Sequence, residues 1–168
     1  KKELQREHPS LKFAFSRPGF VTFKSLEGPL PADFELKSVF ARAYGLSFGK
    51  NTDPEKALEI ARSLGSSAKA RLHVWERDRH LTGEEPPGFV AGEWQKRLSW
   101  AISTRPEVAN LFETSSVAQV GDWVVDAVAV DENEWWFGVH RHSASHSPYP
   151  GGRPPLSLPQ ESPSRAYL

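Results

Sequence analysis

Apolar and polar residues alternate near the start of the chain with the period of a β-strand. Leu11, Phe13 and Phe15 are separated by Lys12 and Ala14, and a second short apolar run covers residues 20–24. Alternation of this kind is typical of half-buried strands. The intervening Arg-Pro-Gly favours a tight turn, because proline presets φ and glycine permits positive φ. The pattern therefore predicts an antiparallel hairpin.

Two longer apolar runs, over residues 123–130 and 135–139, predict the centre of a sheet. The three residues between them, 131–133, are Asp-Glu-Asn. Strand-like runs joined by such residues are typical of a β-hairpin. Further strands are predicted over residues 41–48 and 70–75. In the Trp135-Trp136 pair the two rings should point to opposite faces of the strand, which predicts one buried ring and one exposed ring able to stack on a base.

Helical periodicity marks the segments between these strands. Over residues 51–65, Ala57, Ile60, Ala61 and Leu64 form one apolar stripe. Thr52 or Asp53 can cap this helix, Glu55 completes a capping-box spacing, and a glycine at position 65 suits its end. Further helices are predicted over residues 1–8, 33–39, 92–103 and 104–112. The mixture of helices and strands predicts an α+β fold.

The chain is expected to contain two subdomains and an extended tail. A Gly-Lys-Asn cluster before the helix at residue 51 places the boundary near 49–51, which gives subdomains over 1–49 and 50–147. The remaining residues, 148–168, hold six prolines. A proline-rich segment is stiff and extended and does not join the centre of a sheet.

Composition limits the classes of function. The 21 basic residues equal the 21 acidic ones, so any nucleic-acid binding must come from a local patch. The absence of cysteine excludes disulfides and thiolate metal sites. No apolar run approaches the roughly 20 residues of a membrane span, and we expect a cytoplasmic protein. Because the sequence holds no methionine, even at position 1, we expect the native start to lie upstream.

Histidines and one carboxylate are the candidate chemical groups of the strands. His140 and His142 are two residues apart, which places both rings on one face of a strand, and His146 follows. Three interpretations are open: a metal site, contacts to phosphate, or a solvated strand end. The lack of a nearby cysteine or carboxylate in the sequence weighs against metal. Asp126, inside an apolar run, is a catalytic base, a hydrogen-bonded buried carboxylate, or a residue on the exposed face of an edge strand.

The segment 138–168 is locally basic within this neutral chain. It contains one acidic residue, Glu161, against three arginines and three histidines, and it also carries tyrosines. Basic groups interleaved with aromatic rings suit single-stranded or looped RNA, and the alternative is a linker with incidental arginines. We expect RNA contacts from Arg141, His142, Tyr149, Arg153 and Arg165. No Gly-rich phosphate loop, nucleophile elbow or H-E-x-x-H motif occurs, so no catalytic residue and no resident metal is assigned.

The tail carries a family resemblance. Residues 143–168 read S-A-S-H-S-P-Y-P-G-G-R-P-P-L-S-L-P-Q-E-S-P-S-R-A-Y-L. This run resembles the segment that enters the catalytic domain of the bacterial 23S rRNA cytidine 2′-O-ribose methyltransferases, which are FtsJ-like enzymes. In that family S-R-x-x-x-K-L-x-E opens the domain. Ser164, Arg165 and Ala166 begin the match, so they are expected to border the cofactor domain, and the family's catalytic lysine would follow Leu168.

The resemblance implies a division of labour between this chain and a domain beyond it. The chain would comprise a ferredoxin-like subdomain that lacks its first strand, followed by a THUMP-like RNA-binding subdomain. It would select and orient 23S rRNA, and no DNA partner is expected. S-adenosylmethionine and the catalytic residues would belong to the protein's own C-terminal methyltransferase domain.

Two other functions stay open. One is a stand-alone protein-interaction module, whose proline-rich tail is a peptide ligand for another protein. The other is a histidine-dependent metalloenzyme.

Overall fold

The computed structural model describes residues 1–38, 41, 43–53, 55–65, 69–77, 96, 100, 104–113, 117–131 and 134–146. They form a mixed α+β structure with two sheets and short helices, as expected from the sequence. Most of the helix predicted over 92–103, and the whole tail over 148–168, lie outside the described residues. The elements are α1 (Lys2–Glu7), β1 (Leu11–Arg17), β2 (Phe20–Ser25), β3 (Leu46–Asn51), α2 (Lys56–Ser63), β4 (Arg71–Glu76), α4 (Pro106–Ala109), β5 (Trp123–Asp131) and β6 (Glu134–Arg141).

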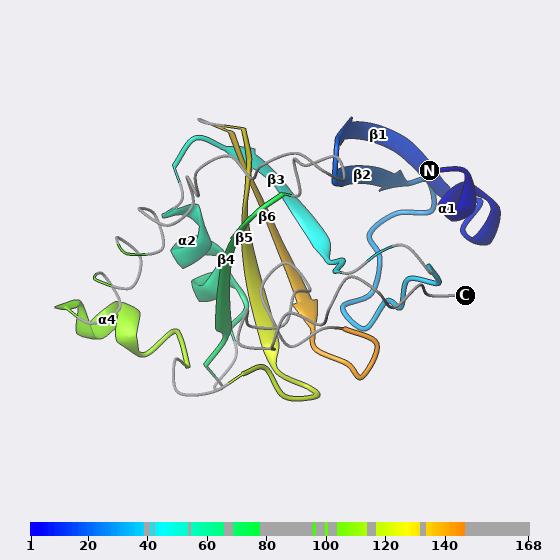
Figure 1. Cartoon of the computed structure of the whole chain (residues 1–168). Helices are drawn as coiled ribbons and strands as arrows, with labels where there is room; N and C mark the ends of the chain where they lie inside the picture. Colours follow the sequence, from blue (N-terminus) through cyan, green and yellow to red (C-terminus); the bar gives the residue numbers. More distant parts are fainter. Residues whose placement is uncertain are drawn as a thin grey trace, which may run out of the picture.

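The larger sheet has four strands in the order β3-β6-β5-β4 (Figure 1). The predicted hairpin of β5 and β6 is confirmed, and its strands occupy the two central positions. β3 is antiparallel to β6, whereas β4 is parallel to β5. Residues 124–130 of β5 are all buried, which explains their continuous apolar run, since a central strand covered on both faces has no solvated side.

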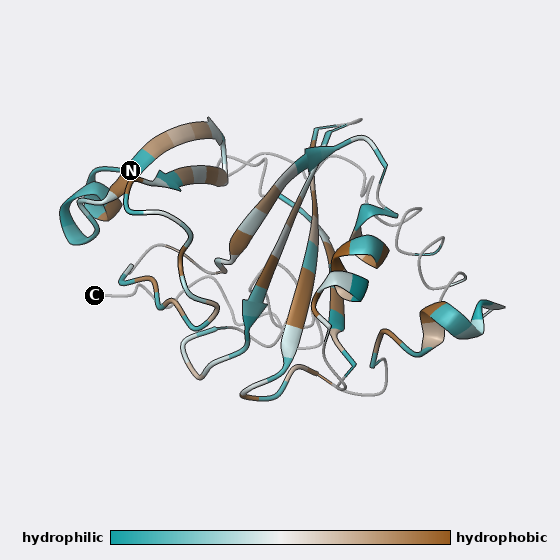
Figure 2. Cartoon of the chain, turned by 180° about the vertical axis from the view of Figure 1, so that it is seen from behind, coloured by the Kyte–Doolittle hydropathy of each residue, from teal (hydrophilic) through white to brown (hydrophobic). Residues whose placement is uncertain are grey.

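Helix α2 covers one face of this sheet. Its predicted stripe is confirmed: Ala57, Ile60 and Ala61 are buried in the main core, where the odd-numbered residues of β5 and β6 also lie. Figure 2 shows the apolar side of the helix turned toward the strands. The helix begins at Lys56 and not at 51, because Asn51 still pairs within β3. Gly65, with φ of 59°, follows its end, as predicted.

Helix α4 closes the core beside β4. Val108 and Phe112 are buried there, and Phe112 forms a parallel bridge with Ala70. The helix predicted over 104–112 begins only at Pro106, and the Thr104 hydroxyl donates to the Trp100 carbonyl oxygen at 2.8 Å and does not cap it. The N-cap position is Arg105, one residue later, and it makes no side-chain cap.

Two predictions between β2 and α2 are also wrong. Residues 33–38 are not helical, because the Lys37 N–H donates to the ring Nε2 of His8 at 3.0 Å and is not available to a helix. The strand predicted over 41–48 begins only at Leu46. Just before it, Gly45 lies against β6, where an added Cβ would be 2.9 Å from the Val139 carbonyl oxygen. At Gly45 the backbone is in close contact with β6 but does not pair with it as a strand.

The smaller sheet is the predicted β1–β2 hairpin, and it contains a bulge. The register shifts between Phe13 and Phe15, so Ala14 has no partner on β2. A bulge of one residue reverses the faces that follow it. Phe13 therefore packs against Phe23, whereas Phe15 points to the opposite face.

This hairpin lies across the four-stranded sheet from α2 (Figure 1). Phe15 stacks on Trp136 of β6 with ring centroids 5.2 Å apart, and Phe20 lies 5.6 Å from the same ring. Trp136 is thus partly covered by aromatic neighbours, while Trp135 is the buried ring of the pair. Asp131 joins the two sheets by accepting hydrogen bonds from Arg17 and Arg77.

The strand β3 crosses the position where the sequence suggested a subdomain boundary. Gly49 lies inside this strand, so residues 46–49 of the first expected subdomain pair with β6 of the four-stranded sheet. Among the described residues, no helix is long and apolar enough to cross a membrane.

Candidate functional site: a buried histidine cluster

The face of the four-stranded sheet turned away from α2 carries an unusual set of polar groups. Because alternate residues of a strand share a face, the register places His73 of β4, Asp126 of β5 and His140 of β6 on this side. His142 and His146 follow on the chain leaving β6. All five side chains, here called the histidine cluster, are buried, with at most 9% of each residue exposed.

Asp126 is the centre of the cluster. Its Oδ2 accepts a hydrogen bond from Nδ1 of His140 at 2.8 Å, and its Oδ1 accepts one from the indole N–H of Trp75 at 3.2 Å. Nδ1 of His73 is 3.7 Å from Oδ1. Burial alone raises the pKa of Asp126, but the hydrogen bond and charge of His140, together with His73 and Trp75, outweigh it and lower the pKa. Asp126 is therefore ionised at neutral pH, and Nδ1 of His140 carries a proton.

His146 is held by a directional chain of hydrogen bonds. Its Nε2 lies 3.1 Å from the Tyr44 carbonyl oxygen, which can only accept, so Nε2 carries the ring proton. Nδ1 must then accept from the Ser143 hydroxyl at 3.0 Å. Ser143 accepts from Ser145 at 2.7 Å, and Ser145 accepts from the Tyr44 hydroxyl at 3.2 Å. Every group in this chain thus has a partner.

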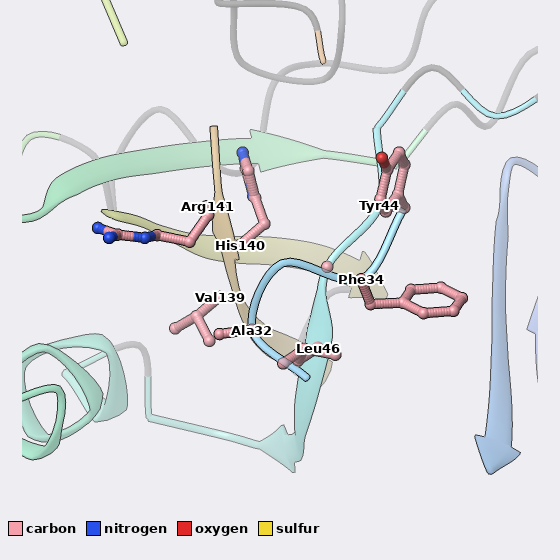
Figure 3. Close-up of a pocket in the computed structure, with 8 residues that line it drawn as sticks. Ala32, Phe34, Tyr44, Leu46, Val139, His140 and Arg141 are labelled. Carbon is pink, nitrogen blue, oxygen red and sulfur yellow. The ribbon is translucent and has the colours of Figure 1, made fainter. Parts of the chain in front are cut away.

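Stacking completes the environment of His146. Its ring is parallel to that of His140, within 7°, at a centroid distance of 4.4 Å, and it lies 4.0 Å from the Tyr44 ring. In Figure 3 the side chains of His140 and Tyr44 point upward from their segments, whereas Val139 points to the other side. Burial, followed by the charge of His140, lowers the pKa of His146 to about 4. The ring is neutral at neutral pH.

Two fully buried ring nitrogens of the cluster have no hydrogen-bond partner among the described residues. These are Nε2 of His140 and Nδ1 of His142, and both are buried. Such atoms are rare in folded proteins and call for a physical explanation, such as a bound ion or water. Burial is also the main cause that lowers the pKa values of His142 and His73. Both rings therefore favour the neutral form.

The structure corrects the interpretation of the strand end as a solvated surface. His142, an expected RNA contact, is only 6% exposed. Arg141 points to the other face of β6, where its Nη1 donates to the Gly121 carbonyl oxygen at 2.7 Å and its guanidinium lies 4.9 Å from the Trp123 ring centroid. The other predicted site residues, Tyr149, Arg153, Ser164, Arg165 and Ala166, lie outside the described residues.

Sequence reasoning missed two members of this environment. His73 and Tyr44 reach the cluster from distant parts of the chain, through the parallel pairing of β4 with β5 and through the approach of Gly45 to β6. Nothing in the local sequence indicates either contact. Across the described ranges, no group of three or more histidine or carboxylate side chains is arranged to hold a metal ion.

A second candidate surface is the N-terminal unit of α1 and the β1–β2 hairpin. Lysines and arginines outnumber acidic residues over residues 1–25, a local excess within this neutral chain. Lys12 and Lys24 are exposed and directly opposite each other in the hairpin. Like charges placed in this way repel, and within the described part of the chain neither lysine has an acidic partner.

An open groove separates this basic unit from the polar face of the larger sheet. Its volume is ≈ 1700 Å³, and Lys1, Lys2, Arg17 and Lys24 are among the residues that line it. The acidic side chains of Glu3, Glu76 and Asp126 also line the groove. Among these, Glu76 and Asp126 belong to the larger sheet, so Glu3 is the one acidic residue, among those described, that lines the groove from the side of the N-terminal unit.

Comparisons with protein-family models, with curated proteins and with solved structures found no match.

Proposed function

We propose that this chain is the RNA-binding part of an S-adenosylmethionine-dependent 23S rRNA ribose 2′-O-methyltransferase. It holds the rRNA for the protein's own C-terminal methyltransferase domain, in the cytoplasm. The observation that carries the proposal is the exposed lysine pair of the hairpin, Lys12 and Lys24, of which Lys24 lines an open groove. Two cations without acidic partners among the described residues are stabilised by an anion, and a phosphate backbone supplies anions at regular spacing.

The resemblance of residues 143–168 to the family's entry segment supports the same function. It implies that the N-terminal unit belongs to the ferredoxin-like subdomain and that the four-stranded sheet belongs to the THUMP-like subdomain. Phosphate contacts fix the position of RNA without reading its sequence. In this division of labour the lysine pair docks the rRNA, and Arg141, Arg153 and Arg165 add contacts nearer the catalytic domain.

The methyl transfer takes place in the C-terminal domain of the proposed enzyme. S-adenosylmethionine bound there would supply the methyl group, which would pass from its sulfur to the deprotonated 2′-oxygen of the ribose. Such a displacement depends strongly on the alignment of the two reactants. A separate module that holds the rRNA therefore contributes directly to the rate.

The test is RNA binding measured across a salt series. Fluorescence anisotropy with a 23S rRNA stem-loop should give an affinity that falls with salt, as counterion release requires. Replacing Lys12 or Lys24 with Gln should weaken binding and reduce the salt slope by about one for each phosphate that is no longer bound. Lys69→Gln, which removes another exposed lysine, just before β4, is the matched control and should bind like the unmodified chain.

Two results would count against the proposal. One is binding that is absent or independent of salt, and the other is an equal effect of all three lysine substitutions. In either case the protein-interaction module, with its proline-rich tail as the peptide ligand, becomes the better hypothesis.

A further inference from the structure

Phe48 is an exposed aromatic ring on the edge strand β3 of the larger sheet. The register of β3 on β6 shifts between Ser47 and Gly49, so Phe48 has no partner on β6 and belongs to a bulge. The Ser47 hydroxyl oxygen accepts a hydrogen bond from the Gly49 N–H at 3.0 Å, and the φ of 87° at Gly49 suits glycine, so the bulge is well defined. Phe48 remains 50% exposed. Bulges often redirect a side chain next to a functional site, and this one holds a large apolar ring where a ligand can reach it.

The bulge borders the open groove between the N-terminal unit and the larger sheet. Phe48 is among the residues that line this groove, and β3 is the edge strand on the side of the hairpin (Figure 1). Aromatic residues of β2 and β6 line it as well, among them Phe23, Trp136 and Phe137. The groove therefore offers several flat apolar surfaces to a ligand that enters it.

Cations line the same groove from the N-terminal unit. They are Lys1, Lys2, Arg17 and Lys24. Glu3, the acidic residue on this side, already accepts a hydrogen bond from the Ser38 hydroxyl at 3.1 Å. Arg17 is ion-paired with the larger sheet, whereas Lys2 and Lys24 are exposed and have no acidic partner within the described ranges. The charge on this side of the groove favours an anionic ligand.

Trp136 adds a hydrogen-bond donor to the wall of the groove. Its indole N–H is buried, and no residue of the described part of the chain accepts from it. Indole N–H groups that are buried usually have a partner, so this one indicates an acceptor that is not among the described residues. Phe15 and Phe20 lie 5.2 Å and 5.6 Å from the Trp136 ring, centroid to centroid, and hold it in place.

We propose, on the basis of the RNA-binding function proposed above, that this groove holds unpaired nucleotides and not a duplex. A base stacks on Phe48, the phosphates contact Lys2 and Lys24, and the Trp136 N–H donates to an acceptor atom of a base. Grooves that combine cations with aromatic rings bind single strands in this way. Unpaired bases can be turned outward and stacked on an aromatic side chain, whereas the bases of a duplex are covered by their neighbours. Because every base has a π-face, the groove selects the form of the RNA and not its sequence.

The experiment compares two labelled probes by fluorescence anisotropy with the full chain. One is an oligouridine of about 10 nucleotides, and the other is an RNA duplex of the same length. At equal salt concentration the oligouridine should bind about tenfold more tightly than the duplex. Equal, salt-dependent affinity for both probes would overturn this proposal and leave the proposed function standing. Absence of binding to either probe would overturn both.

Variants separate stacking from attraction between charges. Phe48→Ala should lower the affinity for oligouridine about tenfold and leave duplex binding unchanged, whereas Phe48→Tyr, which keeps the ring, should retain the affinity. Phe13→Ala removes an exposed ring outside the groove and is the matched control. Lys24→Gln should weaken the binding of both probes, because phosphate contacts do not depend on base pairing. Unchanged oligouridine affinity in Phe48→Ala, or an equal loss in Phe13→Ala, would overturn the proposal.

Two further measurements test the remaining parts of the site. Trp136→Phe keeps a ring between Phe15 and Phe20 but removes the N–H, and should lower the oligouridine affinity about fivefold; an unchanged affinity would contradict the role of this donor. Light scattering of the chain without RNA tests whether a second copy occupies the groove. A dimer that becomes monomeric in Phe48→Ala would overturn the proposal, because the ring would then be a contact between two copies of the chain.

Discussion

Removing the carboxylate of Asp126 tests whether the polar face of the sheet depends on one buried acceptor. In Asp126→Ala, Nδ1–H of His140 and Nε1–H of Trp75 both lose their partner, at sites now 2.8 Å and 3.2 Å from the carboxylate. A buried donor without a partner costs about 1–3 kcal/mol. Two such donors together give an expected decrease of about 2–6 kcal/mol in the free energy of unfolding.

Urea unfolding followed by circular dichroism and tryptophan fluorescence measures this decrease. Asp126→Asn keeps one acceptor oxygen in nearly the same volume, so its decrease should be roughly half that of the alanine variant. Asp33→Ala, at an exposed aspartate of a loop, should stay within about 0.5 kcal/mol of the unmodified chain. The reasoning is refuted if Asp126→Ala costs less than about 1 kcal/mol, or if the Asn and Ala variants are equally destabilised.

Three further predictions concern the joint between the sheets and the close approach of β3. Burial raises the pKa of Asp131, but hydrogen bonds from Arg77 and Arg17 outweigh it and hold the pKa below its usual range. Since the folded-state pKa is below the unfolded one, the stabilisation is complete above about pH 4 and is lost as the pH falls through the folded pKa. Asp131 is partly exposed, so Asp131→Asn should lower the free energy of unfolding in urea by at most about 1 kcal/mol at about pH 7. The difference between the variant and the unmodified chain should disappear near about pH 2. A difference that grows in acid would contradict this. Trp136→Ala removes the ring that stacks on Phe15, and should accelerate amide hydrogen exchange in β1 and β2 while leaving β5 protected; equal acceleration in both sheets would show that they unfold as one unit. Gly138→Ala places a Cβ 3.0 Å from a β3 carbonyl oxygen and should cost about 1–3 kcal/mol in thermal or urea unfolding, whereas a neutral effect would mean that β3 moves away freely.

Patterns along the sequence predicted the helices and strands whose formation depends on neighbouring residues. The apolar run of β5, the turn residues after it and the stripe of α2 all specify burial at fixed spacing, and the structure confirms these elements. The segment over residues 33–38 and the start of β3 were mispredicted because their conformation depends on contacts with His8 and with β6, far away in the sequence. Helical or strand periodicity carries no information about such partners.

The candidate site was predictable only in part, for a related reason. The His140–His142 pair was recognisable from its spacing, and Asp126 stood out as a charge within an apolar run. Their mutual contact follows from the register of β5 on β6, in which Asp126 is opposite Gly138. A shift of one residue would have turned Asp126 to the face of α2. Register is set by the complete sheet, so the sequence alone left the pair as two unconnected candidates.

The bulge at Ala14 gives the first hairpin two different surfaces. Ahead of the bulge, Phe13 packs on Phe23, away from the larger sheet; beyond it, Phe15 meets Trp136. In a regular strand Phe13 and Phe15 would point to the same side. The strand could then either attach the hairpin to Trp136 or form an aromatic pair on its outer face, but not both. Deletion of Ala14 would restore the regular alternation of faces. The chain would then lose either the contact of Phe15 with Trp136 or the contact of Phe13 with Phe23.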